Sequence, residues 1–256
     1  MPNWCYNSMT VKGPKADLER FIKAVTLPEK DEAKTSNGND AGVFDFALLY
    51  PTPEPLKITD RSWGPEFYDK ASPEERAELD SLVAQYESNI KTYGYKTWYD
   101  WNCANWGTKW SPRVESLELD QYSHLEDSYY IRSYFETAWC PATGLLAKIS
   151  EQFPTLIFEV SSDEESEAFV TCEIFYRGGV FEAGFDPYKT DELPDGLRER
   201  IIAKQNELIE LSQIEMGSDQ WSEVRIELSE LYNELKDEAE IEASRKFLAQ
   251  FPNAYA

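Results

Sequence analysis

The chain has 256 residues, of which 41% are hydrophobic, and its 48 acidic residues against 25 basic ones give a formal net charge of −23. The apolar content excludes wholesale disorder. The charge disfavours direct binding to nucleic acid or to anionic membranes and suits a basic partner protein. No apolar run reaches the about 18–20 residues that cross a bilayer, and the start does not resemble a signal peptide. We therefore expect a cytoplasmic protein.

Metal and cofactor binding are not expected from the cysteine and histidine pattern. Cys5, Cys103, Cys140 and Cys172 are far apart and form no C-x-x-C pair, and His124 is the single histidine. Structural zinc sites are built from closely spaced pairs of such ligands, which this sequence lacks. We therefore expect reduced and mostly buried thiols. The glycine-rich phosphate-binding loops are absent as well, which predicts no nucleotide cofactor.

The first segments predict a strand, a helix and a loop. Residues 7–13 alternate as a strand does, and Pro14 starts a helix. The helix is expected to bury one face, formed by Leu18, Phe21, Ile22 and Val25. Residues 26–42 are polar and predict an exposed loop. Residues 43–50 predict a short strand or an extended segment, closed by Pro51, Pro53 and Pro55.

Residues of about 60–97 predict a helical insertion. Ser72 is a good N-cap residue, Pro73 suits the first helical position, and the 93–95 segment, with Gly94 at its centre, ends the helix. Its apolar residues repeat at helical spacing and are Leu79, Leu82, Val83, Tyr86 and Ile90.

Tryptophans are concentrated in residues 98–110, which hold four of the chain's eight. Trp98 and Trp101 share one face of a helical turn that Gly107 ends. We interpret these rings as an aromatic seam on which the chain packs; a cofactor or base-stacking platform is the alternative. The seam is expected to comprise Trp4, Trp98, Trp101, Trp106, Trp110 and Trp139.

The middle of the chain predicts an α+β fold. Residues 116–122 and 129–137 predict a strand hairpin, residues 141–153 a second helix, and residues 155–160 a further strand. Another hairpin follows, from 168–176 to 180–185, through Gly178 and Gly179. Without the insertion, the order is that of a ferredoxin-like β-α-β-β-α-β antiparallel sheet.

The last residues, 189–256, predict an acidic helical hairpin beside a domain of residues 1–188. Two amphipathic helices flank a break at Gly217-Ser218. In the second helix, apolar residues recur every three or four positions. The hairpin could pack on its own sheet, or it could mediate homo-oligomerisation or partner binding.

Several motifs in residues 1–188 resemble the YubB ferredoxin-like family. They are the opening Met-Pro-Asn-Trp-Cys-Tyr-Asn with Val11 and Gly13-Pro14, the Trp-Gly-Thr-Lys-Trp segment 106–110, the segment 135–141, and the strand from Tyr176 to Gly179. The family occurs in phages and on conjugative plasmids. The resemblance implies this fold and a bacterial host cell, and it supplies no catalytic residue.

Enzymatic chemistry has little support in the sequence. His124 lies in a polar turn without an adjacent nucleophile, so we expect no catalytic residue. Lys109 is the best-placed cation; it could hold the carboxylate of Asp100 or bind an anion. An enzyme with an unrecognised carboxylate and lysine site is therefore one alternative.

The remaining hypotheses concern binding. Residues 161–167 predict an acidic loop that could imitate phosphates in a basic groove, together with acids of the last helix. The first hypothesis is a non-enzymatic phage or plasmid protein that engages a host protein with a basic surface, such as a defence nuclease that it inhibits as a nucleic-acid mimic. The expected binding residues are Asp163, Glu164, Glu165, Glu167, Glu227, Glu230 and Glu234. The alternative is a single-stranded nucleic-acid or RNA module that stacks bases on Trp101, Tyr130, Tyr134 and Phe175.

Overall fold

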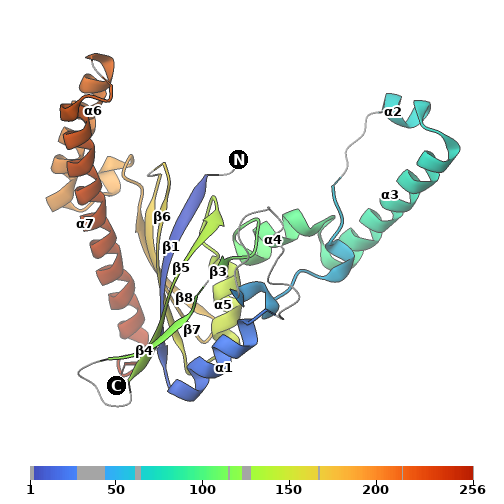
Figure 1. Ribbon diagram of the computed structural model, residues 1–256, viewed down its shortest axis with the longest axis horizontal. Coiled ribbons are helices and arrows are strands. Elements are labelled where there is room, and N and C mark those ends of the chain that lie inside the picture. Colours follow the sequence, from blue (N-terminus) through green and yellow to red (C-terminus); the bar gives the residue numbers. More distant parts are fainter. Residues whose placement is uncertain are drawn as a thin grey trace.

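A computed structural model gives the fold as one six-stranded antiparallel sheet with helices on both faces (Figure 1). The strand order is β4-β5-β1-β6-β7-β8. The strands are β1 (Trp4–Gly13), β4 (Glu118–Gln121), β5 (Tyr129–Ala138), β6 (Ile157–Glu164), β7 (Val170–Tyr176) and β8 (Gly179–Phe185). The structure describes residues 3–27, 44–60, 65–114, 116–122, 128–166, 168–214 and 216–255. Residues 28–42 of the loop expected at 26–42, and the turn with His124, lie outside these residues.

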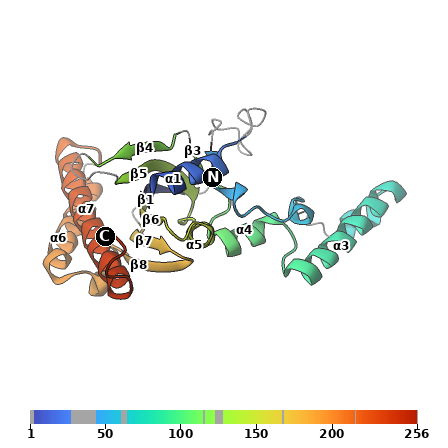
Figure 2. The same cartoon turned by 90° about the horizontal axis from the view of Figure 1, so that it is seen from below.

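The predicted ferredoxin-like order is confirmed. Strand β1 lies between β5 and β6 and is antiparallel to both, and β4 and β5 form the expected hairpin. Helices α1 (Lys15–Val25) and α5 (Thr143–Gln152) lie together on one face of the sheet (Figure 2). The β7–β8 hairpin then extends the sheet beyond β6, and its turn uses the left-handed conformation at Arg177 and Gly178.

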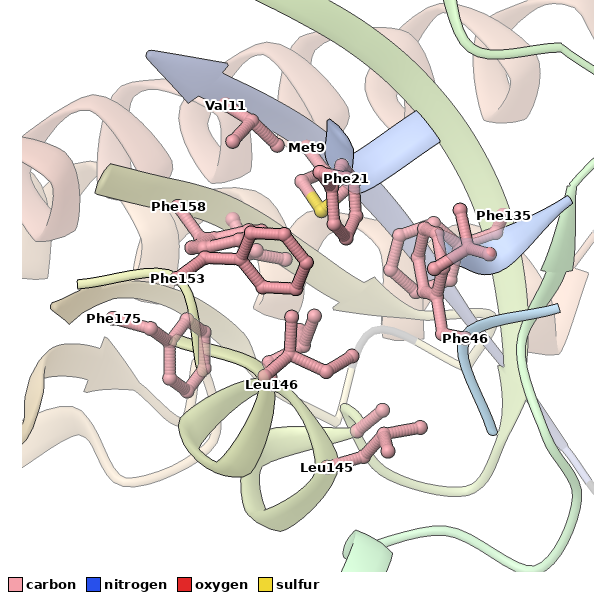
Figure 3. Packing of buried hydrophobic residues seen from close by; sticks show 14 of the residues in the cluster. Met9, Val11, Phe21, Phe46, Phe135, Leu145, Leu146, Phe153, Phe158 and Phe175 are labelled. Atoms are coloured by element: carbon pink, nitrogen blue, oxygen red, sulfur yellow. The ribbon is translucent and has the colours of Figure 1, made fainter. Parts of the chain in front are cut away.

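The main core fills the space between these two helices and the sheet (Figure 3). Phe21 of α1 meets the edges of Phe153 and Phe158, with ring centroids 5.5 and 5.3 Å apart. Leu18, Phe21 and Val25 are fully buried, as the periodicity predicted, and Ile22 is partly buried. Aromatic edge-to-face contacts of this kind add about 0.5–1.5 kcal/mol each to the stability gained from burial.

The short strand or extended segment predicted for residues 43–50 ends at Asp45 in the structure. The strand β2 spans Phe44–Asp45 and pairs with β3 (Arg113–Val114) in a separate two-stranded sheet. A 3₁₀ helix, η1 (Phe46–Leu48), follows because the Asp45 carboxylate accepts a hydrogen bond from the backbone N–H of Ala47 at 2.9 Å and caps the turn.

The helical insertion projects away from the sheet (Figures 1 and 2). Within the predicted bounds of about 60–97 it contains α2 (Pro65–Lys70) and α3 (Pro73–Tyr93), and η2 (Glu54–Leu56) and α4 (Trp98–Trp106) flank it. As predicted, Ser72 caps α3 in a capping box and Gly94 ends it in the left-handed conformation. Leu79 and Tyr86 are buried, whereas Val83 is 39% and Ile90 53% exposed. The apolar face predicted for α3 is therefore only partly buried, because a helix that projects from the domain has few neighbours.

The C-terminal helices pack on the sheet face opposite α1 and α5. After η3 (Thr190–Glu192), α6 (Asp195–Ile214) and α7 (Asp219–Gln250) form the predicted hairpin, with Gly217 in the left-handed conformation and Ser218 capping α7. Phe247 of α7 is fully buried and touches Phe181 of β8, with centroids 5.3 Å apart. Helix α7 therefore covers the β7–β8 half of this face.

The close approach of α4 and α5 depends on a glycine. A Cβ atom on Gly144, in the first turn of α5, would collide with the carbonyl oxygen of Asn105 at the end of α4. We expect Gly144→Ala to lower the free energy of unfolding by about 1–3 kcal/mol, as overpacking does. Urea denaturation followed by circular dichroism measures this change.

Gly196→Ala is the matched control for that experiment. Gly196 lies near the start of α6, and a Cβ atom added there would meet no neighbouring atom within 4 Å, so alanine is expected to be neutral or slightly stabilising. Equal urea midpoints for the two variants would contradict the proposed contact.

Candidate functional site

An open cleft of about 1490 Å³ lies at the end of the sheet where β1 begins and β5 ends. Its walls come from these two strands, from the segments on either side of η1 and after α4, and from Asp163 of β6 and Lys236 of α7. Rings are prominent among the lining side chains, which include Trp4, Tyr6, Trp98, Trp110 and Tyr134.

The cleft exists because α7 covers only part of the sheet face that it packs on. Side chains alternate along β1, so that Cys5 and Asn7 are buried under the helices α1 and α5 while Tyr6 points to the opposite face. On this opposite face, Tyr6 is 43% exposed and Tyr134 of β5 is 74% exposed. The β1–β5 half of the face is thus left open to solvent.

The six tryptophans expected in one seam fall into two groups. Trp101 and Trp106 are buried in the main core, and the Trp106 indole N–H donates to the carbonyl oxygen of Tyr50 at 2.9 Å. The other four border solvent: Trp4 packs against Trp110 with centroids 6.0 Å apart, Trp98 is half-buried, and Trp139 is 38% exposed. The expected seam is therefore divided, with two indoles in the main core and four that are only partly buried or exposed.

Lys109 is held by aromatic rings. Its ammonium nitrogen lies 4.2 Å from the ring centroid of Trp110, 5.5 Å from that of Trp139 and 5.7 Å from that of Tyr99. Such cation–π contacts stabilise an ammonium group by about 0.5–2 kcal/mol each. Among the described residues it forms no ion pair, so the expected pair with Asp100 is not formed.

Carboxylates surround the phenol of Tyr6. Glu136 of β5 and Asp163 of β6 are its direct cross-strand neighbours, and the exposed Glu165 follows β6. Local burial and the negative charges of Glu165, Glu136, Asp163 and Glu164 together raise the pKa of Tyr6. An exposed ring flanked by carboxylates on both neighbouring strands is suited to bind a cation.

The expected acidic loop at 161–167 is largely a strand. Residues 157–164 form β6, which pairs with β1 on one side and β7 on the other, so the segment is fixed in the sheet. Asp163 pairs with Lys236 at 2.6 Å. Glu164 is buried and accepts hydrogen bonds from Ser166; burial raises its pKa, but these hydrogen bonds outweigh that effect and lower it. Glu165 is exposed, and Glu167 lies outside the described residues.

Of the three acidic residues of α7 that were predicted to bind a partner, two form ion pairs within the chain. Glu227 pairs with Lys204 at 2.5 Å, and both oxygens of Glu234 accept hydrogen bonds from Arg200 at 2.6 and 2.7 Å. Glu230 is exposed and takes part in no ion pair within the described residues. Two of the predicted partner-binding residues therefore join α6 to α7 instead.

The four residues expected to stack bases do not form one platform. Trp101, Tyr130 and Phe175 are only 6%, 8% and 0% exposed. Of the four, only Tyr134 is accessible to a base. Tyr6, diagonal to Tyr134 in the β1–β5 pairing, is also exposed, and it was not predicted because the first strand was expected to begin at Asn7. Extending the alternation back to Trp4 would have found it.

A buried carboxylate on the helix side of the sheet was also missed. Glu173 of β7 is 3% exposed, and one of its oxygens accepts a hydrogen bond from the Thr143 hydroxyl at 2.6 Å. The other oxygen is buried without a hydrogen-bond partner among the described residues. Burial raises the pKa of Glu173 to about 7, a shift that the Thr143 hydrogen bond only partly opposes.

This shift predicts a specific pH dependence of stability. Because the folded pKa lies above the ordinary value of 4.5, the folded state holds the proton more tightly, and stability decreases as pH rises from about 4.5 to 7. Glu173→Gln removes this loss. We expect the variant to gain up to about 3 kcal/mol over the wild type between these pH values.

Chemical denaturation of wild type and variant at several pH values measures the difference. Glu78→Gln on α3 is the control, because this exposed glutamate is not among the groups that shift the pKa of Glu173. A wild-type-to-Glu173→Gln difference that does not change with pH would contradict the assignment.

The described parts of the chain hold no cluster of metal-ligating side chains and no helix that could span a membrane. Within them, no three histidine, cysteine, aspartate or glutamate side chains gather as metal ligands. None of the described helices is long and apolar enough to cross a bilayer.

Comparison with known proteins gives little further information. No family model and no curated protein matches the chain. The crystal structure of protein api92 from Yersinia pseudotuberculosis, described with the family DUF1281, aligns at 12% identity with a TM-score of 0.38, over 73% of this chain and 98% of that one. The resemblance to the YubB family therefore stays a prediction.

Proposed function

We propose that this chain is a non-enzymatic binding protein of a phage or plasmid that engages a host protein with a basic surface. A nucleic-acid-handling host protein, such as a defence nuclease, is the partner class that suits the charge, because the chain would present carboxylates where that protein expects phosphates. The observation that carries the proposal is the pattern of paired and unpaired charges on the α6–α7 hairpin.

Every basic side chain of α6 and α7 is already engaged within the chain. Arg200 and Lys204 pair with acids of α7, and Lys236 pairs with Asp163 of the sheet. Arg198 and Arg245 pair within their own helices, Arg225 lies over the Trp221 ring, and Lys246 donates to the carbonyl oxygen of Glu182.

The excess acids of the same helices are left facing solvent. Within the described residues, no ion pair holds Glu199, Glu210, Glu223, Glu230, Asp237 or Glu238, and all six are exposed. Surface charges of one sign raise the association rate with a partner of opposite charge and weaken as salt screens them. The hairpin is therefore the part of the surface best suited to attract a basic protein.

The cleft supports an enzymatic role less well. Of the cleft lysines, Lys109 lies among aromatic rings. Cys5, a buried thiol near the start of β1, has its pKa raised to about 12 by burial and is unreactive in that state. Ser111 and Asp45 bring a hydroxyl and a carboxylate together in the cleft wall, but the same Asp45 oxygen also accepts from the backbone N–H of Ala47 and so caps η1.

The test is capture of a host protein at two salt concentrations with matched charge variants. Glu230→Lys/Glu238→Lys on α7 and Glu78→Lys/Glu87→Lys on α3 each change the net charge from −23 to −19 (−23 + 4). We expect the wild type and the α3 variant to retain a basic nucleic-acid-handling protein at low salt, and the α7 variant to lose most of it.

Duplex DNA added to the captured complex tests the mimicry itself. A mimic occupies the nucleic-acid groove, so DNA is expected to displace the chain, and high salt is expected to release it. Retention that is insensitive to salt, or equal losses in both double variants, would overturn the proposal.

The hairpin is also the proposed site of homo-oligomerisation. Apolar side chains on its outer surface are exposed, with Ile209 at 57%, Ile226 at 61% and Met216 at 73%. If they join two copies, light scattering should give a mass above 29.6 kDa that falls in Ile226→Ser, whereas exposed Ile90→Ser on α3 should leave it unchanged. A monomer at all concentrations would remove this part of the proposal.

A further inference from the structure

The open half of the sheet combines exposed rings with unpaired carboxylates. Tyr6 stands between its cross-strand neighbours Glu136 and Asp163, and directly opposed side chains in a sheet have Cβ atoms about 4.5–5.5 Å apart. Glu136 is exposed, and its side chain makes no hydrogen bond or ion pair within the described residues. Glu165 lies close by, since its backbone N–H donates to the carbonyl oxygen of Trp4 at 2.8 Å.

The lysines that line the cleft do not neutralise these carboxylates. Lys236 is held by Asp163 at 2.6 Å, and Lys57 by Glu54 at 2.8 Å. Lys109 lies over the Trp110 ring and forms no ion pair within the described residues. Glu136 and Glu165 therefore remain as charges without a counterion from the described residues, next to an accessible ring.

We propose that this cleft binds an arginine side chain of the partner protein, with its guanidinium group stacked on Tyr6 and hydrogen-bonded to Glu136 and Glu165. This inference rests on the proposed function, because a basic partner supplies the arginine. It adds the position where one partner residue is recognised, in contrast to the diffuse attraction of the hairpin.

Arginine fits this site better than lysine or a nucleic-acid base. Its planar guanidinium group stacks on a ring and bonds a carboxylate through two N–H groups at once, which an ammonium group cannot do. A base would also stack on Tyr6, but its phosphates would then lie among Glu136, Asp163 and Glu165 and be repelled. Charge complementarity thus selects a protein segment as the occupant.

The test uses the full chain and three labelled peptides of equal length, in which glycine alternates with arginine, lysine or citrulline. Fluorescence anisotropy at low ionic strength measures their affinities. We expect the arginine peptide to bind about tenfold more tightly than the lysine peptide, and the citrulline peptide to bind weakest, since it keeps the shape without the charge.

Single variants locate the binding site. Tyr6→Leu and Glu136→Gln are each expected to weaken binding of the arginine peptide about tenfold. The matched controls, Tyr188→Leu and Glu78→Gln, change an exposed tyrosine and an exposed glutamate elsewhere and should leave the affinity unchanged. Because the Glu136 side chain is exposed, Glu136→Gln tests the site even if Tyr6→Leu fails to fold.

The outcomes separate this inference from the proposed function. Equal affinities for the arginine and lysine peptides, or equal effects of the site and control variants, would overturn the arginine site while the salt-sensitive host partner remained bound. Binding of an oligothymidylate that requires Tyr6 would overturn it in favour of base stacking. Loss of the host partner from the wild type would instead refute the proposed function, whatever the peptides do.

Discussion

The packing of α7 on the sheet is the contact on which the rest of the molecule depends. Phe247, Ala243 and Ala239 of α7 lie against Ile174 of β7 and Phe181 of β8, and all of these side chains are buried. On β1 and β5, the same face carries Tyr6 and Tyr134 among polar and charged side chains such as Glu136, which offer the helix no continuous apolar surface. The helix therefore covers the apolar half and leaves the β1–β5 half open, with its rings and carboxylates accessible to a partner.

Charge is distributed in a way that follows from this packing. Ion pairs such as Arg200 with Glu234 and Lys236 with Asp163 connect the hairpin to itself and to the sheet. Such exposed pairs add little stability individually, about 0–1 kcal/mol, but each removes one of the few cations from the surface. The remaining acids give the hairpin a negative surface, and the cleft a second negative region beside Tyr6. We regard these two regions as parts of one binding surface.

Most of the fold could be predicted from local patterns. The periodicities of β1 and α1, the cap at Ser72 and the break at Gly217-Ser218 depend on neighbours in sequence, and the structure confirms them. The order of elements then sufficed to predict the ferredoxin-like sheet. The prediction failed for residues 46–48 because the Asp45 carboxylate accepts a hydrogen bond from the backbone N–H of Ala47, which directs the chain into a 3₁₀ turn.

The site could be predicted only in part, because its chemistry depends on contacts between distant segments. The sequence identifies Glu164 and Glu165 as neighbouring acids, but only the pairing of β6 with β1 and β7 decides that the first is buried and the second exposed. Likewise, the spacing of Trp98 and Trp101 fixes their helix, and the surrounding chain decides which indole meets solvent. Tyr6 and Glu136 are 130 residues apart and become neighbours through β-strand pairing.

Tyrosine-selective chemical modification, read by mass spectrometry, tests the central claim most directly. If α7 leaves the β1–β5 half of the sheet open as a binding surface, Tyr6 and Tyr134 react in the free chain and become protected when the host partner binds, while the exposed Tyr188 reacts in both states and the buried Tyr232 in neither. Protection of Tyr6 and Tyr134 in the free monomer, or unchanged reactivity of both in the complex, would contradict the account.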